Sequence, residues 1–277
     1  MIYNKTMKET FNIILLVMMI VLLHACSPPQ GVDVPLPATP DNNAFTLERG
    51  SEKGILLLHG LTATPWEVRA LATYLADHNV TVVAPLLPGH GTTAADLNTK
   101  RWEEWYAAAN DSLRDLRPRV KKLYVGGVST GADLAVLLAA EHELDGVILI
   151  ATPIELQDGR AQFASVYKYL LPYAPSKNVG DEIGHYYDYF PSNAVAELVS
   201  LIGKVKTALP RVSEPALILQ SIHDKTVKPQ SANFVYAHLG SARKEWLLYG
   251  NATHVLVKEK DAPDIVFTSV DDFITQN

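Results

Sequence analysis

The chain has 277 residues, a length that suits one large α/β domain or two small ones. A hydrophobic content of 48% and a charged content of 19% describe a globular chain that can bury a full core. The formal net charge is −6, and no basic stripe with interleaved aromatic residues is present, so we expect no nucleic-acid partner.

The first 25 residues differ in composition from the rest of the chain. Lys5 and Lys8 precede an unbroken apolar run over residues 13–23, which is shorter than the roughly 18 residues that a transmembrane helix needs. A basic start followed by a short apolar stretch is typical of a signal peptide. We therefore predict that residues 1–25 are removed on export.

Cys26 is the only cysteine, so no internal disulfide can form. It directly follows Leu23-His24-Ala25, and this run resembles a bacterial lipobox, whose cysteine is lipidated after cleavage. The resemblance implies a mature chain that starts at Cys26 and is held on a membrane of the bacterial cell envelope by its acyl chains. Ser27 implies sorting to the outer membrane, on the periplasmic side. An ordinary signal peptide with an incidental cysteine and an uncleaved anchor are the alternatives.

Residues 27–43 are rich in proline and poor in aromatic residues. This composition is typical of a linker without regular structure. The sequence therefore predicts three parts, which are a signal peptide over 1–25, a lipidated Cys26 with a tether over 26–43, and a globular domain over 44–277.

Segments typical of strands and helices alternate along the globular domain. Short apolar runs indicate strands that are buried on both faces of a parallel sheet. The expected strands are 55–58, 80–84, 123–126, 146–151, 216–220 and 245–249. The expected helices are 65–77, 102–116, 132–141, 230–239 and 263–275. Repeated strand–helix units predict an α/β fold with a mostly parallel, doubly wound sheet and helices on both faces.

The stretch from about 152 to 210 interrupts this alternation, because it shows no clear strand and is too long for a plain connection. It is rich in tyrosine and phenylalanine. We expect a small helical cap, inserted after strand 6 of the fold, that closes over the site. Tyr167 and Tyr187 are the cap residues that we expect to line a substrate pocket. The alternative is that the cap aromatics only anchor the cap to the domain.

Ser129 lies in Gly127-Val-Ser-Thr-Gly131, between a β-branched apolar run and a helix-forming run. Gly-x-Ser-x-Gly on a strand-to-helix turn is the pattern of a nucleophile elbow. Glycine is needed on both sides because the helix comes close to the strand there. The pattern predicts that Ser129 is a nucleophile, whereas the alternative is an ordinary glycine-rich turn.

A serine nucleophile needs a histidine base and an acid that orients it, in the chain order Ser, Asp or Glu, His. His254 follows the last expected strand, and we predict that it is the base, although a surface-loop histidine is the alternative. Asp224 follows the strand over 216–220 and is the predicted acid. Glu155 follows the preceding strand and is the second choice. His223 is predicted to be a bystander.

The backbone N–H of Thr130 is one expected donor to an oxyanion, because it belongs to the residue after the nucleophile. The second donor comes from the loop after an early strand, His59-Gly60-Leu61-Thr62, so we predict the N–H of Leu61. His59 and His90 are expected to shape turns rather than to take part in catalysis.

Several of these segments together resemble the bacterial carboxylesterase and monoacylglycerol lipase family of α/β hydrolases. They are residues 56–66, residues 84–92, residues 127–131, Asp224-Lys-Thr-Val and His254. The resemblance covers about residues 45–275 and implies an α/β-hydrolase fold and ester hydrolysis through an acyl-enzyme. It also implies a small-molecule ester with an apolar acyl group as substrate, and no metal or other cofactor. Thr130 stands where relatives often carry a methionine that lines the acyl pocket, so Leu61 and Thr130 are also predicted to bind substrate.

Other functions fit the same residues. Thioester, amide or carbon–carbon bond cleavage can use the same triad, because fold and triad do not fix the leaving group. A catalytically silent binding protein tethered to the envelope is the alternative from another class, but such chains usually lose a triad member. The acyl chain length and the oligomeric state stay open.

Overall fold

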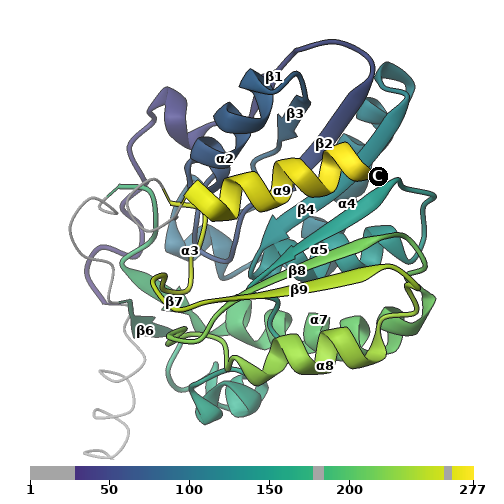
Figure 1. Cartoon of the computed structure of the whole chain (residues 1–277). Helices are drawn as coiled ribbons and strands as arrows, with labels where there is room; N and C mark the ends of the chain where they lie inside the picture. The colour runs from purple at the N-terminus through teal and green to yellow at the C-terminus, as the bar shows by residue number, and fades with distance from the viewer. Residues whose placement is uncertain (1–28, 177–183, 259–263) are drawn as a thin grey trace, which may run out of the picture.

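The structure is a computed structural model, and it describes residues 29–176, 184–258 and 264–277. A seven-stranded sheet runs through the centre of the molecule with helices on both faces (Figure 1). Along the sheet the strands follow the order β1-β3-β2-β4-β5-β8-β9, and all neighbours are parallel except β1, which is antiparallel to β3. The strands are β1 (Phe45–Leu47), β2 (Lys53–Leu58), β3 (Thr81–Ala84), β4 (Lys122–Val128), β5 (Gly146–Ile150), β8 (Ala216–Ser221) and β9 (Lys244–Tyr249).

Two hydrophobic cores lie on the two faces of this sheet. Helices α2 (Trp66–Asp77) and α9 (Asp264–Gln276) cover one face, while α4 (Trp102–Leu116), α5 (Thr130–Ala139), α7 (Ser192–Ala208) and α8 (Gln230–His238) cover the other. The central strands are apolar on both sides for this reason: Leu56 and Leu58 of β2 face one core, while Ile55 and Leu57 face the other. The predicted α/β-hydrolase fold is confirmed.

The cap lies between β5 and β8, at the edge of the sheet where the parallel strands end. The inserted stretch begins directly after β5 and ends before β8, as expected from the sequence. The cap is not purely helical. Besides η3 (Gly159–Phe163), α6 (Ala164–Tyr167) and the start of α7, it contains the antiparallel pair β6 (Tyr173–Pro175) and β7 (Tyr189–Pro191). These strands have three residues each, which is too short for an alternating pattern to show in the sequence.

Short elements complete the described chain, and none of them was expected from the sequence. They are η1 (Pro40–Asn42), α3 (Ala94–Leu97), η2 (Arg117–Arg119) and η5 (Leu209–Arg211). The α3 turn begins after Thr93, whose side chain accepts a hydrogen bond from the Asp96 N–H. It therefore has a local cap but no hydrophobic period long enough to predict.

The segment before β1 corrects one expectation. Residues 29–43 do not form a free tether, because the segment packs on the domain. Val32 is only 2% exposed and belongs to the larger core. The Leu36 N–H donates to the Thr92 carbonyl at 2.9 Å, and the Asn42 side chain donates to the carbonyls of Pro37 and Gly184. We call residues 30–42 the docked segment.

The predicted signal peptide over 1–25 and Cys26 lie outside the described residues. Within residues 29–176, 184–258 and 264–277, no helix is long and apolar enough to cross a membrane.

Candidate active site

Ser129 stands at the junction of β4 and α5 in a strained backbone conformation. Its φ is 53° and its ψ is −121°, a region that non-glycine residues rarely adopt. The Ser129 N–H donates to the Ile150 carbonyl at 2.9 Å, which ties the turn to the end of β5. The side chain is nearly buried, at 8% exposure. This geometry matches the expected elbow and directs the first N–H groups of α5 toward the space beside the serine.

The glycines on both sides of Ser129 have a steric role. A Cβ at Gly127 would overlap the backbone of Gly131, and a Cβ at Gly131 would overlap the carbonyl of Leu58. Helix α5 therefore rests directly on the ends of β4 and β2. Only glycine allows this close approach, which is why the strand, the turn and the helix can form the elbow.

His254 and Asp224 are brought together from two different loops. Asp224 follows β8 and His254 follows β9, and the His254 Nδ1 lies 2.7 Å from the Asp224 Oδ2. Since β4, β8 and β9 run parallel, all three loops lie at the carboxyl edge of the sheet, on the same side as Ser129. Ser221, the last residue of β8, holds the loop that carries His254, because its Oγ donates to the Ala252 carbonyl.

Asp224 is buried and held by four donors, of which the sequence indicated only His254. Its Oδ1 accepts the N–H groups of Thr226 and Val227 at 2.8 Å each, and its Oδ2 accepts the Gln220 side chain at 2.9 Å. Burial alone would raise the pKa of Asp224, but the hydrogen bond from His254, the charge of His254 and the two backbone donors together lower it. The carboxylate is therefore ionised and ready to hold the Nδ1–H tautomer of His254.

Glu155, the second choice for the acid, lies on the surface. Its carboxylate is exposed and pairs with Lys228 at 3.2 Å. The structure therefore brings Asp224, and not Glu155, to His254. His223 is exposed, as expected of a bystander.

The loop after β2 lies against Ser129. A Cβ placed on Gly60 would stand 3.4 Å from the Ser129 Cβ, so the loop backbone borders Ser129. Among the described residues none accepts a hydrogen bond from the Leu61 N–H, which leaves this donor available. Thr130 is fully buried at the start of α5, and its Oγ1 has no hydrogen-bond partner within the described residues. The oxyanion roles of Leu61 and Thr130 stay predictions.

His59 braces this loop instead of taking part in proton transfer. Its Nε2 accepts the Leu87 N–H at 3.1 Å, so its Nδ1 carries the proton and donates to the Gly60 carbonyl at 3.0 Å. Burial lowers the pKa of His59 to about 4, although the hydrogen bond to Gly60 raises it. A neutral His59 therefore links the loops after β2 and β3.

Glu67 is another residue of this site that the sequence did not reveal. It lies in the first turn of α2, is 3% exposed, and accepts the Gly60 N–H at 2.6 Å and the Tyr186 hydroxyl at 2.9 Å. Burial raises the pKa of Glu67 above its ordinary value. Those two hydrogen bonds and the charges of His254 and Lys258 offset only part of this rise. Glu67 thus connects the cap to the loop beside Ser129. A glutamate early in a helix is usually exposed, so no pattern marked it.

The two cap tyrosines that were predicted to bind substrate have different surroundings. Tyr187 is 2% exposed, and its hydroxyl donates to the Gly89 carbonyl at 2.7 Å and accepts the Thr92 N–H at 2.9 Å. Burial raises its pKa to about 12. The Tyr187 hydroxyl therefore bonds the backbone of the segment between β3 and α4, residues 85–101, which we call the rim. Tyr167 is half-buried on α6, and its role in substrate binding stays a prediction.

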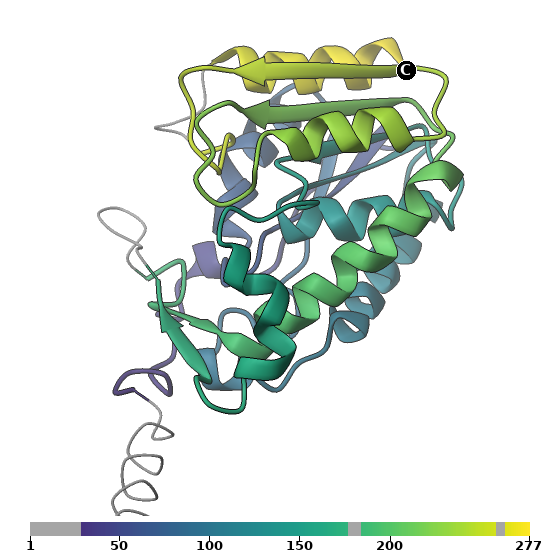
Figure 2. The same ribbon diagram turned by 90° about the horizontal axis from the view of Figure 1, so that it is seen from below.

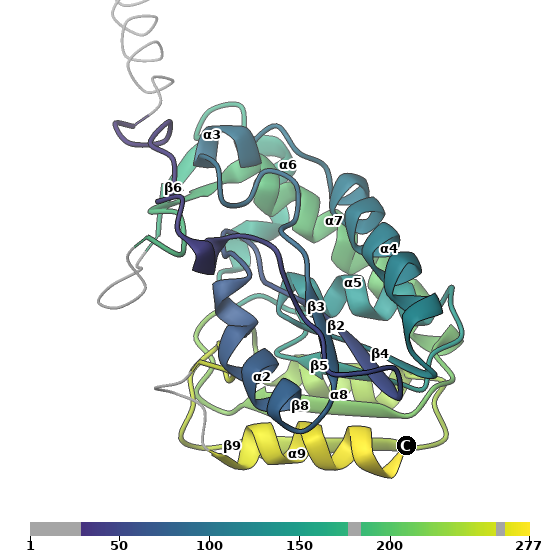
Figure 3. The same cartoon turned by 90° about the horizontal axis from the view of Figure 1, so that it is seen from above.

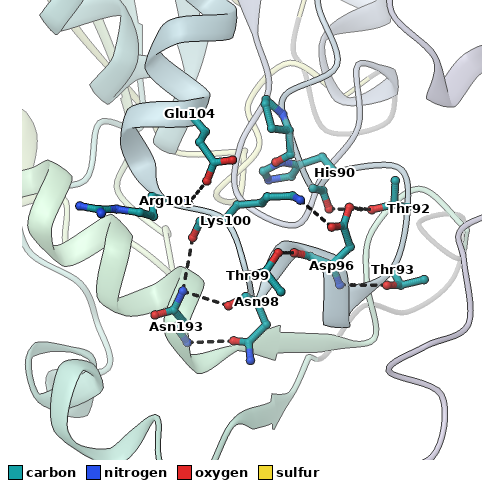
Figure 4. Close-up of polar contacts among 12 residues, drawn as sticks. His90, Thr92, Thr93, Asp96, Asn98, Thr99, Lys100, Arg101, Glu104 and Asn193 are labelled. Atoms are coloured by element: carbon teal, nitrogen blue, oxygen red, sulfur yellow. Dashed lines mark hydrogen bonds and ion pairs between the residues drawn. The ribbon is translucent and has the colours of Figure 1, made fainter.

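A polar network joins the rim to the cap (Figure 4). The Asn193 side chain at the start of α7 donates to the carbonyls of Asn98 and Lys100, at 2.9 and 3.3 Å. On the rim, Asp96 pairs with Lys100 at 2.7 Å and accepts the Thr92 hydroxyl at 2.8 Å. The cap is thus fixed to the segment between β3 and α4 by backbone acceptors as well as by apolar packing.

Within the described residues, no group of three or more His, Cys, Asp or Glu side chains could hold a metal ion.

A strained serine where a parallel strand meets a helix, with an aspartate–histidine pair on two later loops of the same sheet edge, defines the α/β-hydrolase class. The comparison with known families agrees, because residues 55–267 match the Alpha/beta hydrolase family. The chain belongs to this family.

Individual relatives are lipases and esterases by name. The chain is 30% identical over 224 residues to the thermostable monoacylglycerol lipase of Bacillus sp. (strain H-257), a match that covers 79% of this chain and 90% of that protein. It is 25% identical over 231 residues to a carboxylesterase of Bacillus subtilis (strain 168), covering 82% and 94% of the two chains. Among solved structures, one described for the metagenome-derived lipolytic enzymes LipS and LipT is 27% identical, with a TM-score of 0.80 and coverage of 87% and 100%. The chain is thus a carboxylesterase- and lipase-like α/β hydrolase.

Proposed function

We propose that the chain hydrolyses carboxylic esters with an apolar acyl group through an acyl-enzyme on Ser129. The observation that carries this proposal is the 2.7 Å contact between His254 Nδ1 and Asp224 Oδ2, at the sheet edge where the Ser129 elbow lies. The named relatives, a monoacylglycerol lipase and a carboxylesterase, support an ester as the substrate.

In the proposed reaction, His254 Nε2 takes the proton of the Ser129 hydroxyl while the oxygen attacks the ester carbonyl. The negative charge that develops on the carbonyl oxygen is stabilised by the N–H groups of Leu61 and Thr130. His254 then gives its proton to the leaving alcohol, and the acyl group remains on Ser129. A water molecule, deprotonated by His254, releases the acid and restores the serine.

We propose that Leu61, Thr130 and Tyr167 bind a single acyl chain of short to medium length. In support, a Cβ on Gly60, the residue before Leu61, would stand 3.4 Å from the Ser129 Cβ, and Tyr167 lies half-buried on α6 of the cap. The Thr130 hydroxyl is buried without a partner among the described residues, and Thr130 directly follows Ser129 in the chain.

A labelling experiment tests the proposed nucleophile. A fluorophosphonate probe should label the wild-type chain on Ser129 and should fail to label Ser129→Ala, while Ser200→Ala on the exposed face of α7 should behave as wild type. Hydrolysis of a series of p-nitrophenyl esters then gives the acyl preference. Equal activity in Ser129→Ala and the wild type would refute the proposal, although roughly 10³–10⁴ over the uncatalysed rate can persist without the triad.

We also propose that Cys26 is lipidated and anchors the domain in the cell envelope. The short apolar run before it and the Leu-x-Ala-Cys pattern support this. Mass spectrometry of the mature N-terminus from the native host is the test. A lipidated Cys26 as first residue is expected, and an unmodified Cys26 or an intact Met1 would refute the anchor.

A further inference from the structure

Five large apolar side chains are exposed together on one part of the cap. They are Phe163 (59%), Val166 (70%), Tyr169 (75%), Leu170 (56%) and Leu171 (59%). All five belong to one continuous stretch, from the last residue of η3 through α6 to the turn before β6. Single exposed apolar residues are ordinary, whereas a run of five within nine positions marks a surface that is covered in use. We call this surface the cap patch.

The docked segment reaches the same end of the molecule. The Tyr189 hydroxyl of β7 donates to the Gln30 carbonyl at 3.2 Å. β7 pairs with β6, which begins two residues after the cap patch ends. In Figures 2 and 3 the purple start of the described chain lies beside this ribbon, at the end of the molecule that also carries η3 and α6.

The docking of residues 30–42 shortens the distance that any anchor at Cys26 can span. A free tether from residue 26 to residue 43 would reach about 60 Å when extended, at about 3.6 Å per residue. Because the Gln30 carbonyl is already bonded to the cap, only three residues, a span of four residue-to-residue steps, lie between Cys26 and Gln30. These reach about 14 Å at most. An anchor at Cys26 therefore holds the cap end, and not the opposite end, near the bilayer.

We propose that the docked segment holds the cap patch against the phospholipid bilayer in which Cys26 is anchored. The inference rests on the proposed lipidation of Cys26. The composition of the patch fits a lipid surface, because Lys168 lies within it with its Nζ 5.4 Å from the centre of the Tyr169 ring. A lysine and aromatic rings among aliphatic side chains are typical of groups at the membrane–water interface.

This orientation has a consequence for substrate entry. The cap lies at the carboxyl edge of the sheet, where Ser129 and His254 also lie. With the cap patch in the interface, an ester with an apolar acyl chain passes from the leaflet to the site without crossing water. A lipid ester is then a better substrate in the membrane that carries the enzyme than in solution.

Fluorescence quenching on the full-length, membrane-bound protein tests the contact. A thiol-reactive bimane probe is placed on Val166→Cys in the cap patch, and in a matched protein on Ala242→Cys, an exposed position before β9 at the opposite edge of the sheet. With Cys26 lipidated, the introduced cysteine is the only free thiol. Bilayers with brominated acyl chains should lower the emission at position 166 by about two-fold or more and leave position 242 unchanged.

Other results of the quenching experiment distinguish a failure of the membrane docking from a failure of the lipid anchor. Lipidated protein whose position 166 is not quenched would overturn the docking and leave the anchor intact. A blue-shifted probe at position 166 without quenching would show that a protein surface covers the patch, and this also overturns the proposal. Cys26 that carries no lipid would overturn the anchor and the docking together.

Activity provides a second readout. The double variant Val166→Glu/Leu170→Glu places charges in the cap patch, and Ile265→Glu places one on an apolar side chain of α9 that is 60% exposed. We expect the double variant to lose about ten-fold in hydrolysis of esters embedded in vesicles, with soluble esters hydrolysed within two-fold of wild type. Ile265→Glu should change neither rate. Equal loss on both kinds of ester would contradict a role in docking.

Discussion

The Glu67 carboxylate accepts the Gly60 N–H at 2.6 Å, and this contact joins α2 to the loop beside Ser129. The other carboxylate oxygen accepts the Tyr186 hydroxyl of the cap. One buried side chain thus ties both the cap and the loop of the predicted oxyanion donor to the same helix. The position of the Leu61 N–H depends on this tie, because Leu61 follows Gly60 directly.

Replacing Glu67 tests that dependence. Glu67→Ala leaves the Gly60 N–H without its acceptor, so we expect kcat to fall roughly 10- to 100-fold, less than the about 10²–10³ that loss of a whole oxyanion donor costs. KM should stay within about three-fold, because the loop acts on the transition state. Steady-state kinetics with a soluble p-nitrophenyl ester measure both.

Two further variants control the Glu67 experiment. Glu67→Gln keeps an acceptor for Gly60 and a group that can bond the Tyr186 hydroxyl, so most of kcat should return. Glu143→Ala removes an exposed glutamate and should be silent. If Glu67→Ala changes only the thermal stability and not kcat, the residue has no positioning role.

The choice between the two candidate acids gives a direct comparison. Asp224→Asn removes the carboxylate that holds the Nδ1–H tautomer of His254, and a loss of about 10³–10⁴ in kcat is expected. Glu155→Gln breaks only an exposed pair with Lys228, so its kcat should lie within two-fold of wild type. Pre-steady-state acylation rates decide the matter, and a large loss in Glu155→Gln would reverse the assignment.

The pH dependence of stability should reflect His59. Its pKa is about 4 in the folded chain and 6.5 as an ordinary histidine, so the unfolded chain binds more protons between these values. The stabilisation is complete above pH 6.5 and is lost as the pH falls through about 4. Well below pH 4, the folded chain therefore loses about 3 kcal/mol of this stabilisation. His90, whose pKa burial also lowers, adds in the same direction.

Urea denaturation at pH 7.5 and at pH 4.5 measures this loss. In His59→Asn the difference in unfolding free energy between the two pH values should shrink by about 2 kcal/mol, because pH 4.5 still lies above the folded pKa of about 4. His78→Asn changes an exposed histidine and should keep the wild-type difference. An unchanged difference in His59→Asn would show that His59 is not the titrating group.

Gly131 of α5 and Gly203 of α7 are both helical glycines, but replacing each with alanine should change the free energy of unfolding in opposite directions. In Gly131→Ala the new methyl group overlaps the Leu58 carbonyl, so we expect destabilisation by more than about 4 kcal/mol. Gly203 lies within α7 with no atom close to a Cβ, so Gly203→Ala should stabilise by about 0.5–1 kcal/mol. Thermal melts of both variants measure the signs, and a tolerated Gly131→Ala would contradict the close approach of α5 to β2.

Strong local patterns made much of the fold predictable. The helix over 102–116 was placed with its bounds correct, because its apolar residues recur at helical spacing and Pro118 follows it. The strands of the parallel sheet are continuous apolar runs, and the elbow is a short motif between two clear elements. The class of fold follows from such segments.

Features that depend on distant contacts could not be predicted. β6 and β7 have three residues each and form only because they pair with each other across the cap. Gln220 and Glu67 support the site through contacts with groups that the fold alone brings near. Asp224 is predictable because the chain order of the triad is fixed in this class and because Asp224-Lys-Thr-Val resembles a segment of the family.

The docked segment shifts the boundary of the folded unit. Composition placed the start of the domain at residue 44, but Val32 fills part of the core, and Asn42 bonds both Thr64 beside α2 and His185 of the cap. A recombinant chain trimmed to residue 44 would lose these contacts and leave a hollow where Val32 was. Expression, crystallisation and screening of this enzyme therefore call for a start no later than Pro29.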